Sequence, residues 1–129
     1  MPKKTKGCKK GASPVDETPA EKFVRASLNS NKVVVFVGSE DPFSMRALSA
    51  LRRSGVKTKF MNSVMISGIQ GEDDIRDYFL EITDGRSLPR VFVNGKFVGG
   101  ASDLEYLEIS GELQQLLKQA KCYKPVKPF

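Results

Sequence analysis

The longest continuous apolar run in the first half of the chain extends from Val33 to Val37. Five apolar residues in a row, rich in valine, are typical of a strand that is buried on both faces. Gly38 ends the run, Asp41 is a good helix-capping residue, and Pro42 fits the first helical position. Apolar residues then recur at helical spacing, namely Met45, Ala47, Leu48, Ala50 and Leu51. This pattern predicts a buried strand that turns sharply into a helix at the carboxyl edge of a sheet, where open α/β sheets usually hold their chemistry.

The flanking patterns predict alternating helices and strands. A helix is expected from Thr18-Pro19 to Ser30, a strand over 56–62 and a loop over 63–71. The next helix begins at Glu72 and ends at Asp84-Gly85, and its acidic first turn suits the helix dipole. Its expected buried face consists of Ile75, Tyr78, Phe79 and Ile82.

The clearest local signal is a hairpin near the carboxyl end of the chain. Apolar residues over 91–93 and 96–98 flank Asn94-Gly95, a pair typical of a type I′ turn. A short helix is expected to open at Ser102-Asp103, and a last helix follows through Leu113 and Leu117. The order of elements predicts an α/β three-layer sandwich: a four-stranded mixed sheet, with one parallel βαβ unit followed by an antiparallel pair, flanked by helices.

Charge divides the chain into three parts. The net charge is +6, and residues 1–11 carry five lysines while residues 121–129 carry three, so the remainder is slightly acidic. We therefore expect a disordered basic arm over 1–16, a folded domain over 17–120 and a basic tail over 121–129. The ends are interpreted as solubility segments or, alternatively, as contacts for an acidic partner. Nucleic acid is not an expected partner, because no aromatic residue interleaves with the first lysines.

The rare residues exclude several chemistries. The chain has no histidine, which removes Ser-His and Cys-His catalysis and the commonest metal ligand, and no metal site is expected. The two cysteines, Cys8 and Cys122, lie near the chain ends and do not suggest a disulfide scaffold, so a reducing compartment, the cytoplasm, is expected. No apolar run approaches the ~20 residues of a membrane span.

Several motifs together resemble the glutaredoxin branch of the thioredoxin fold. They are Arg86-Ser87-Leu88-Pro89, the hairpin and diglycine over 91–100, and the helix starts at 102–104 and 110–113. The resemblance covers about 17–120 and implies that Pro89 is cis and faces the turn at Asp41. It also implies that the Leu88 backbone pairs with glutathione or an extended peptide, and that Gly99, Gly100, Ser102 and Asp103 hold the γ-glutamyl end of glutathione. Arg86 is interpreted either as a further cation for that ligand or as a solvated loop residue.

The departure from the family lies at the turn itself. Asp41-Pro42-Phe43-Ser44 stands where the family has Cys-Pro-Tyr-Cys, and Gly38 stands where the family usually has a lysine. Thiol–disulfide exchange needs a thiolate, so no catalytic residue is predicted, and the iron–sulfur binding of some relatives is not expected. Asp41 is interpreted as a helix cap, as a mimic of a bound thiolate, or as an acid/base partner of Glu40.

We therefore expect a binding or regulatory module with a residual groove for glutathione or peptide and without a resident cofactor. Glutathione binding is expected to be weak, because Glu40 and Asp41 repel an anion. One alternative is a weak glutathione-dependent oxidoreductase in cell redox homeostasis that uses a non-standard cysteine, Cys8 or Cys122. The other is an adaptor that binds acidic partners through its basic tails.

Overall fold

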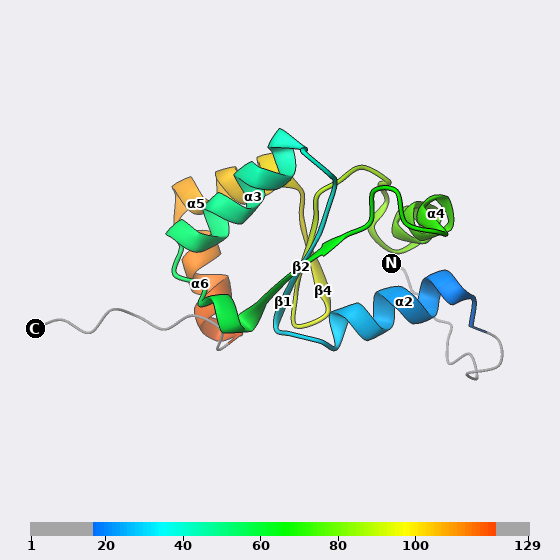
Figure 1. Ribbon diagram of the computed structural model, residues 1–129. Helices are drawn as coiled ribbons and strands as arrows, with labels where there is room; N and C mark the ends of the chain where they lie inside the picture. Colours follow the sequence, from blue (N-terminus) through cyan, green and yellow to red (C-terminus); the bar gives the residue numbers. More distant parts are fainter. Residues whose placement is uncertain (1–16, 121–129) are drawn as a thin grey trace, which may run out of the picture.

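The computed structural model describes residues 17–120, which form a four-stranded sheet between two layers of helices (Figure 1). The expectations for 1–16 and 121–129, and for Cys8 and Cys122 within them, lie outside the described residues. The elements in chain order are α2 (Pro19–Leu28), β1 (Val33–Val37), α3 (Pro42–Arg53), the 3-10 helix η2 (Thr58–Phe60), β2 (Met61–Met65), α4 (Glu72–Thr83), β3 (Arg90–Val93), β4 (Lys96–Gly99), α5 (Ala101–Ser110) and α6 (Glu112–Gln119).

Strand β1 lies inside the sheet, whose order is β2-β1-β3-β4. It pairs in parallel with β2 and antiparallel with β3, and β3 continues into β4 as a hairpin. All five residues of β1 are buried, as the apolar run predicts. The mixed sheet and the three-layer architecture are therefore confirmed.

Each face of the sheet has its own hydrophobic core, because side chains alternate along a strand. Val33, Val35 and Val37 pack with α3, α5 and α6 on one face. Val34 and Phe36 pack with α2 and α4 on the other, where Phe36, Phe79 and Phe92 form an aromatic cluster with ring centroids 4.9–6.3 Å apart. Figure 1 shows the two helical layers on either side of the sheet.

The local turn predictions hold. Asn94 and Gly95 have φ values of 51° and 80°, as a type I′ turn requires. Thr18 caps α2 and Asp41 caps α3, each followed by a proline. The Leu88-Pro89 peptide bond is cis, as the resemblance implies.

The second strand was predicted wrongly over 56–62, and the loop over 63–71 was wrong at its start. The strand covers Met61–Met65, and Thr58–Phe60 form a 3-10 turn. Val56 is buried because the chain reverses there after α3, where its N–H donates to the Leu51 carbonyl. β2 is an edge strand with half-exposed polar residues, so it lacks the apolar signature of β1.

Two apolar residues of the predicted helices are exposed, and one of them, Ile82, was expected on the buried face of its helix. Met45 is 64% exposed, because α3 turns Ser44, Ala47 and Leu51 toward the sheet. Ile82 is 40% exposed, because it lies in the last turn of α4, outside the core that Ile75 and Phe79 enter. In the described chain, no helix combines the length and apolar character needed to cross a bilayer.

Candidate functional site

Three segments meet at the carboxyl end of β1: the turn over 38–44, the cis-proline segment and the diglycine before α5. A Cβ atom at Gly38 would lie 3.4 Å from Leu88 Cδ1 and 3.5 Å from Asp41 Cβ. A Cβ atom at Gly100 would lie 3.3 Å from the Pro89 carbonyl oxygen. The structure therefore brings together the turn, Leu88-Pro89 and Gly99-Gly100, which are far apart in the sequence.

A closed hydrogen-bond network occupies the turn. Asp41 Oδ1 accepts from the Phe43 N–H at 3.1 Å, and Ser44 Oγ donates to Asp41 Oδ2 at 2.8 Å. Ser44 Oγ also accepts from the Gly38 N–H at 3.1 Å. The Ser44 side chain is buried at 3% exposure, so a substrate has no direct approach to its hydroxyl. Both oxygen-bearing side chains serve the turn, and Asp41 is a helix cap.

Ser67 is a residue of this turn that the sequence analysis missed. Its Oγ accepts from the Ser39 N–H at 3.0 Å, and a Cβ atom at Gly38 would lie 3.1 Å from it. The contact joins positions 28 residues apart. Since Ser67 lies in a glycine- and serine-rich stretch, no local pattern marks it.

The diglycine is folded tightly against the start of α5. Asp103 Oδ2 accepts from the Gly100 N–H at 3.1 Å, so that N–H is already used within the protein. Gly99 has a φ of +148°, and a Cβ atom there would lie 2.5 Å from Asp103 Cβ. Only glycine fits at position 99 without movement of Asp103. Ser102 is exposed beside this turn.

Two arginines near the cis-proline segment, Arg76 and Arg86, are held at α4, whereas Arg90, next to Pro89, lies 5.1 Å from the Phe97 ring centroid and forms none of the ion pairs seen among the described residues. Arg86 Nε donates to Asp77 Oδ1 at 3.0 Å. Arg76, which the sequence analysis missed, donates to Glu72 Oε2 at 2.9 Å and to the Arg86 carbonyl at 3.0 Å. The pKa of Glu72 is lowered, first by the Gly68 N–H and then by Arg76. Arg86 is therefore committed to an ion pair with α4.

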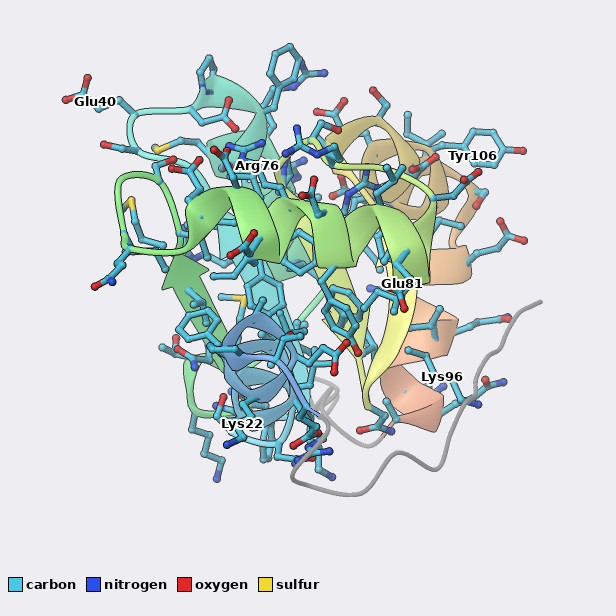
Figure 2. All side chains as sticks on the ribbon, turned by 90° about the vertical axis from the view of Figure 1, so that its right-hand side faces the viewer. Lys22, Glu40, Arg76, Glu81, Lys96 and Tyr106 are labelled. Carbon is cyan, nitrogen blue, oxygen red and sulfur yellow. The ribbon has the colours of Figure 1, made fainter. Side chains whose placement is uncertain are left out.

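The exposed tip of the turn is aromatic and acidic. Phe43 is 52% exposed, and the Arg46 guanidinium lies 5.5 Å from its ring centroid. Arg46 is itself paired with Glu105 of α5 through two hydrogen bonds. Figure 2 shows Glu40 projecting from the same end of the molecule as Arg76. Within the described residues, neither Glu40 nor Asp41 forms an ion pair.

The groups that these three segments bring together limit the chemistry available at this place. Residues 17–120 contain no cysteine, and they present no cluster of acidic residues arranged to hold a metal ion. A serine nucleophile needs an accessible hydroxyl and a base, and the Ser44 hydroxyl is buried. The segment before the cis-proline is different, because Leu88 is half-buried and the sheet pairing of β3 starts two residues later, at Arg90.

Comparison with known proteins finds the same fold in solved structures and identifies related sequences. The glutaredoxin family profile matches residues 33–98, from the start of β1 into β4. Human glutaredoxin-1 is 37% identical over 100 residues, covering 78% of this chain and 94% of the relative. Glutaredoxin-1 of vaccinia virus is 38% identical over 98 residues, covering 76% and 91%. The crystal structure of oxidized glutaredoxin 2 from Chlamydomonas reinhardtii superposes with a TM-score of 0.73 at 35% identity, covering 80% of this chain and 94% of that chain.

A thioredoxin-like sandwich with a cis-proline facing a strand–helix turn defines the class of protein. Within that class, the chain belongs to the glutaredoxin family.

Proposed function

We propose that this glutaredoxin-family protein is a binding module that carries out no thiol–disulfide exchange at its turn. The observation that carries the proposal is the closed network of Gly38, Asp41 and Ser44, which contains oxygen where exchange chemistry needs sulfur. A carboxylate and a hydroxyl cannot form a mixed disulfide with a substrate. The turn is thus stable and redox-inert.

The groove beside the turn is the proposed binding surface for an extended peptide. Leu88 lies next to the turn and outside the paired part of β3, so its backbone groups can pair with an extended chain. Backbone pairing does not depend on the side chain at that position. The exposed Phe43 ring offers apolar contact at one end of this groove.

Charge favours a basic peptide over glutathione. Glu40 and Asp41 place two carboxylates at the tip, while Arg46, Arg76 and Arg86 are each paired with an acid and Arg90 lies against the Phe97 ring. An anionic ligand meets repulsion, and each lost charged contact lowers affinity by roughly 1.5–3 kcal/mol. Glutathione is therefore a weak ligand in this proposal, and a peptide bearing lysine or arginine is the preferred one. The proposed location is the cytoplasm, whose reducing conditions suit a chain without a disulfide framework.

The chemical half of the proposal is tested by hydroxyethyl disulfide reduction with glutathione and glutathione reductase. The full chain and its Cys8→Ser/Cys122→Ser variant should show the same background rate. The Asp41→Cys/Ser44→Cys variant is the positive control and should reduce the disulfide measurably if the groove is intact. Turnover of the natural chain well above that of the variant without cysteines would refute the proposal.

The binding half is tested with two blocked peptides of alternating sequence, one of valine and lysine and one of valine and glutamate. Amide shifts at Leu88 and Phe43 should saturate with the basic peptide and stay small with the acidic one. The Glu40→Gln/Asp41→Asn variant should lose this preference. Equal shifts with both peptides would show that charge does not select the ligand.

A further inference from the structure

Strand β2 lies at one margin of the sheet, and within residues 17–120 no strand pairs with its outer side. It pairs with β1 alone, in a regular parallel register from Met61 to Met65. Figure 2 shows β2 at one margin of the sheet and the β3–β4 hairpin at the other. An edge strand has N–H and C=O groups that point away from the sheet and can pair with a further strand. The outer side of β2 is therefore a candidate interaction surface.

The two edges of the sheet differ in the features that prevent such pairing. β4 begins with a charged residue, Lys96, and its ladder with β3 contains a register shift between Val91 and Phe92. Charged residues, prolines and bulges are the usual means by which proteins block an edge strand. β2 reads Met-Asn-Ser-Val-Met, with no charge, no proline and no register shift in its pairing with β1. The β2 edge is therefore the one better suited to a partner strand.

The side chains of β2 are self-complementary when two copies of the strand run antiparallel. Because side chains alternate along a strand, Met61, Ser63 and Met65 share one face of the sheet. Met61 packs against the core on the α3 side, whereas Met65 is 50% exposed. When Ser63 faces its counterpart, Met65 of one copy lies opposite Met61 of the other, so each exposed methionine gains an apolar neighbour. Antiparallel pairing about Ser63 thus covers apolar surface on the α3 side.

The end of β2 leads to an acidic surface. The Gly68 N–H donates to Glu72 Oε1 at 2.8 Å, which holds the first turn of α4 near the end of the strand. That turn exposes Asp73 and Asp74, which line a solvent-open hollow of about 400 Å³ beside Gly68. A cationic side chain from a neighbouring molecule would suit this hollow.

The start of β2 is basic, and this charge selects the same antiparallel orientation. The chain enters β2 through two exposed lysines, Lys57 and Lys59. Antiparallel pairing brings the basic end of each copy to the acidic end of the other, whereas parallel pairing brings like charges together. A two-fold axis through Ser63 makes the two charged contacts identical.

We propose that the chain forms a weak homodimer in which two β2 strands pair antiparallel about Ser63 and join their four-stranded sheets. The partner is a second copy of this chain, because one register satisfies both the methionines and the charged ends. Pairing over five residues gives an interface smaller than the roughly 1,200 Å² of stable complexes. We therefore expect a dissociation constant between about 10 µM and 1 mM. The inference is independent of the proposed function, because no residue of the groove is needed for the pairing.

The test is sedimentation equilibrium of the full chain at concentrations from about 10 µM to 1 mM. The Cys8→Ser/Cys122→Ser background excludes disulfide-linked dimers, and the measured mass should rise toward that of two chains. Ser63→Lys places two lysines opposite each other at the axis and should raise the dissociation constant about tenfold or more. Gln115→Lys adds the same charge at an exposed position on α6 and should leave the dissociation constant unchanged.

Charge reversal tests the orientation of the two copies. Lys57→Glu/Lys59→Glu gives each strand two acidic ends, and Asp73→Lys/Asp74→Lys gives it two basic ends. Each variant should weaken the dimer about tenfold. The variant with all four substitutions has opposite charges at the two ends again and the net charge of the natural chain. Its dissociation constant should return to within about threefold of the natural value.

Three results would overturn the proposal. One is the mass of a single chain throughout the concentration range. Another is an equal effect of Ser63→Lys and Gln115→Lys, which would show that net charge and not the β2 edge controls association. The third is a variant with all four substitutions that stays as weak as the two reversals, which would exclude the antiparallel arrangement. Amide spectra of each variant at low concentration verify that it is folded.

Discussion

Ser44 forms hydrogen bonds with two partners from a buried position in the first turn of α3. It accepts from the Gly38 N–H and donates to Asp41 Oδ2. Ser44→Ala removes both bonds and leaves a backbone donor without its partner. We expect a loss of about 1–3 kcal/mol in the free energy of unfolding, measured by urea denaturation.

Ser49→Ala is the matched control, because Ser49 is half-buried on the same helix. Its expected effect is within about 0.5 kcal/mol. If the two variants lost the same stability, the network at the turn would have no particular role.

Gly38 allows a direct test of how charge limits glutathione binding. A side chain at position 38 would lie beside Asp41 and would require Ser67 Oγ to move slightly, since a Cβ atom comes within 3.1 Å of it. Gly38→Lys would supply a cation at the acidic tip. We expect glutathione affinity, followed by NMR shifts at Leu88 and Gly100, to rise about tenfold from a millimolar or weaker value.

Gly38→Gln separates the charge from the added bulk and should leave the affinity near that of the natural chain. Micromolar binding by the natural chain would contradict the argument from repulsion.

Among single residues, the sequence predicts those whose role depends only on their neighbours along the chain. Asp41 and Pro42 follow helix-capping rules, and Asn94-Gly95 follows turn rules, so the structure confirms all of them. Ser67 and Arg76 were missed, because their roles arise from contacts with Ser39 and with the Arg86 carbonyl across the fold. The burial of Ser44 has the same origin, since it depends on how α3 lies on the sheet.

Helices α3 and α5 are joined by two ion pairs on their outer side. Arg46 binds Glu105 and Arg53 binds Glu108, each through two hydrogen bonds. The pKa of each glutamate is lowered, first by the side-chain hydrogen bond from its arginine. The folded state therefore holds these protons less tightly than the unfolded chain does.

The stabilisation from these pairs is full above the unfolded glutamate pKa of about 4.3 and is lost as the pH falls through the lowered folded pKa. The free energy of unfolding of the natural chain, measured in urea, should be lower at strongly acidic pH than at neutral pH, in part because this stabilisation is lost. The Glu105→Gln/Glu108→Gln variant should show a smaller drop between the two conditions. The pairs are exposed, so the difference is modest and decreases with added salt.

Glu81→Gln, at an exposed position on α4, is the control and should keep the pH dependence of the natural chain. If Glu105→Gln/Glu108→Gln kept it as well, the pairs would not contribute to acid unfolding.

Among the elements, those with strong periodicity were predictable and the edge strand was not. β1 and the first strand of the hairpin have continuous apolar runs, which are typical of buried strands. β2 reads Met-Asn-Ser-Val-Met, and its half-exposed face tolerates polar residues, so its bounds are set by pairing with β1. η2 and the reversal at Val56 displaced the strand from the position predicted for it.

For the whole molecule, the two ends of the sheet have opposite character. Glu40 and Asp41 lie at the carboxyl end of β1, whereas Lys32 and Lys59 lie at its amino end. The net charge of the chain does not reveal this separation, because lysines in the terminal segments dominate it. Only the course of β1 through the sheet places the two groups at opposite ends.

The two hydrophobic cores share β1, and this predicts cooperative unfolding. Phe36 belongs to the α2–α4 core, where it contacts Phe79 and Phe92, while its neighbour Val35 belongs to the other core. Phe36→Ala leaves a cavity and should cost about 3–5 kcal/mol. Because the same strand supports both cores, the loss should lower the urea midpoint equally for NMR methyl probes at Ile75 and at Leu113, one in each core. Leu80→Ala, at a position that is 47% exposed on α4, should shift neither midpoint appreciably. Separate midpoints for the two probes in Phe36→Ala would show that the two faces of the sheet unfold independently.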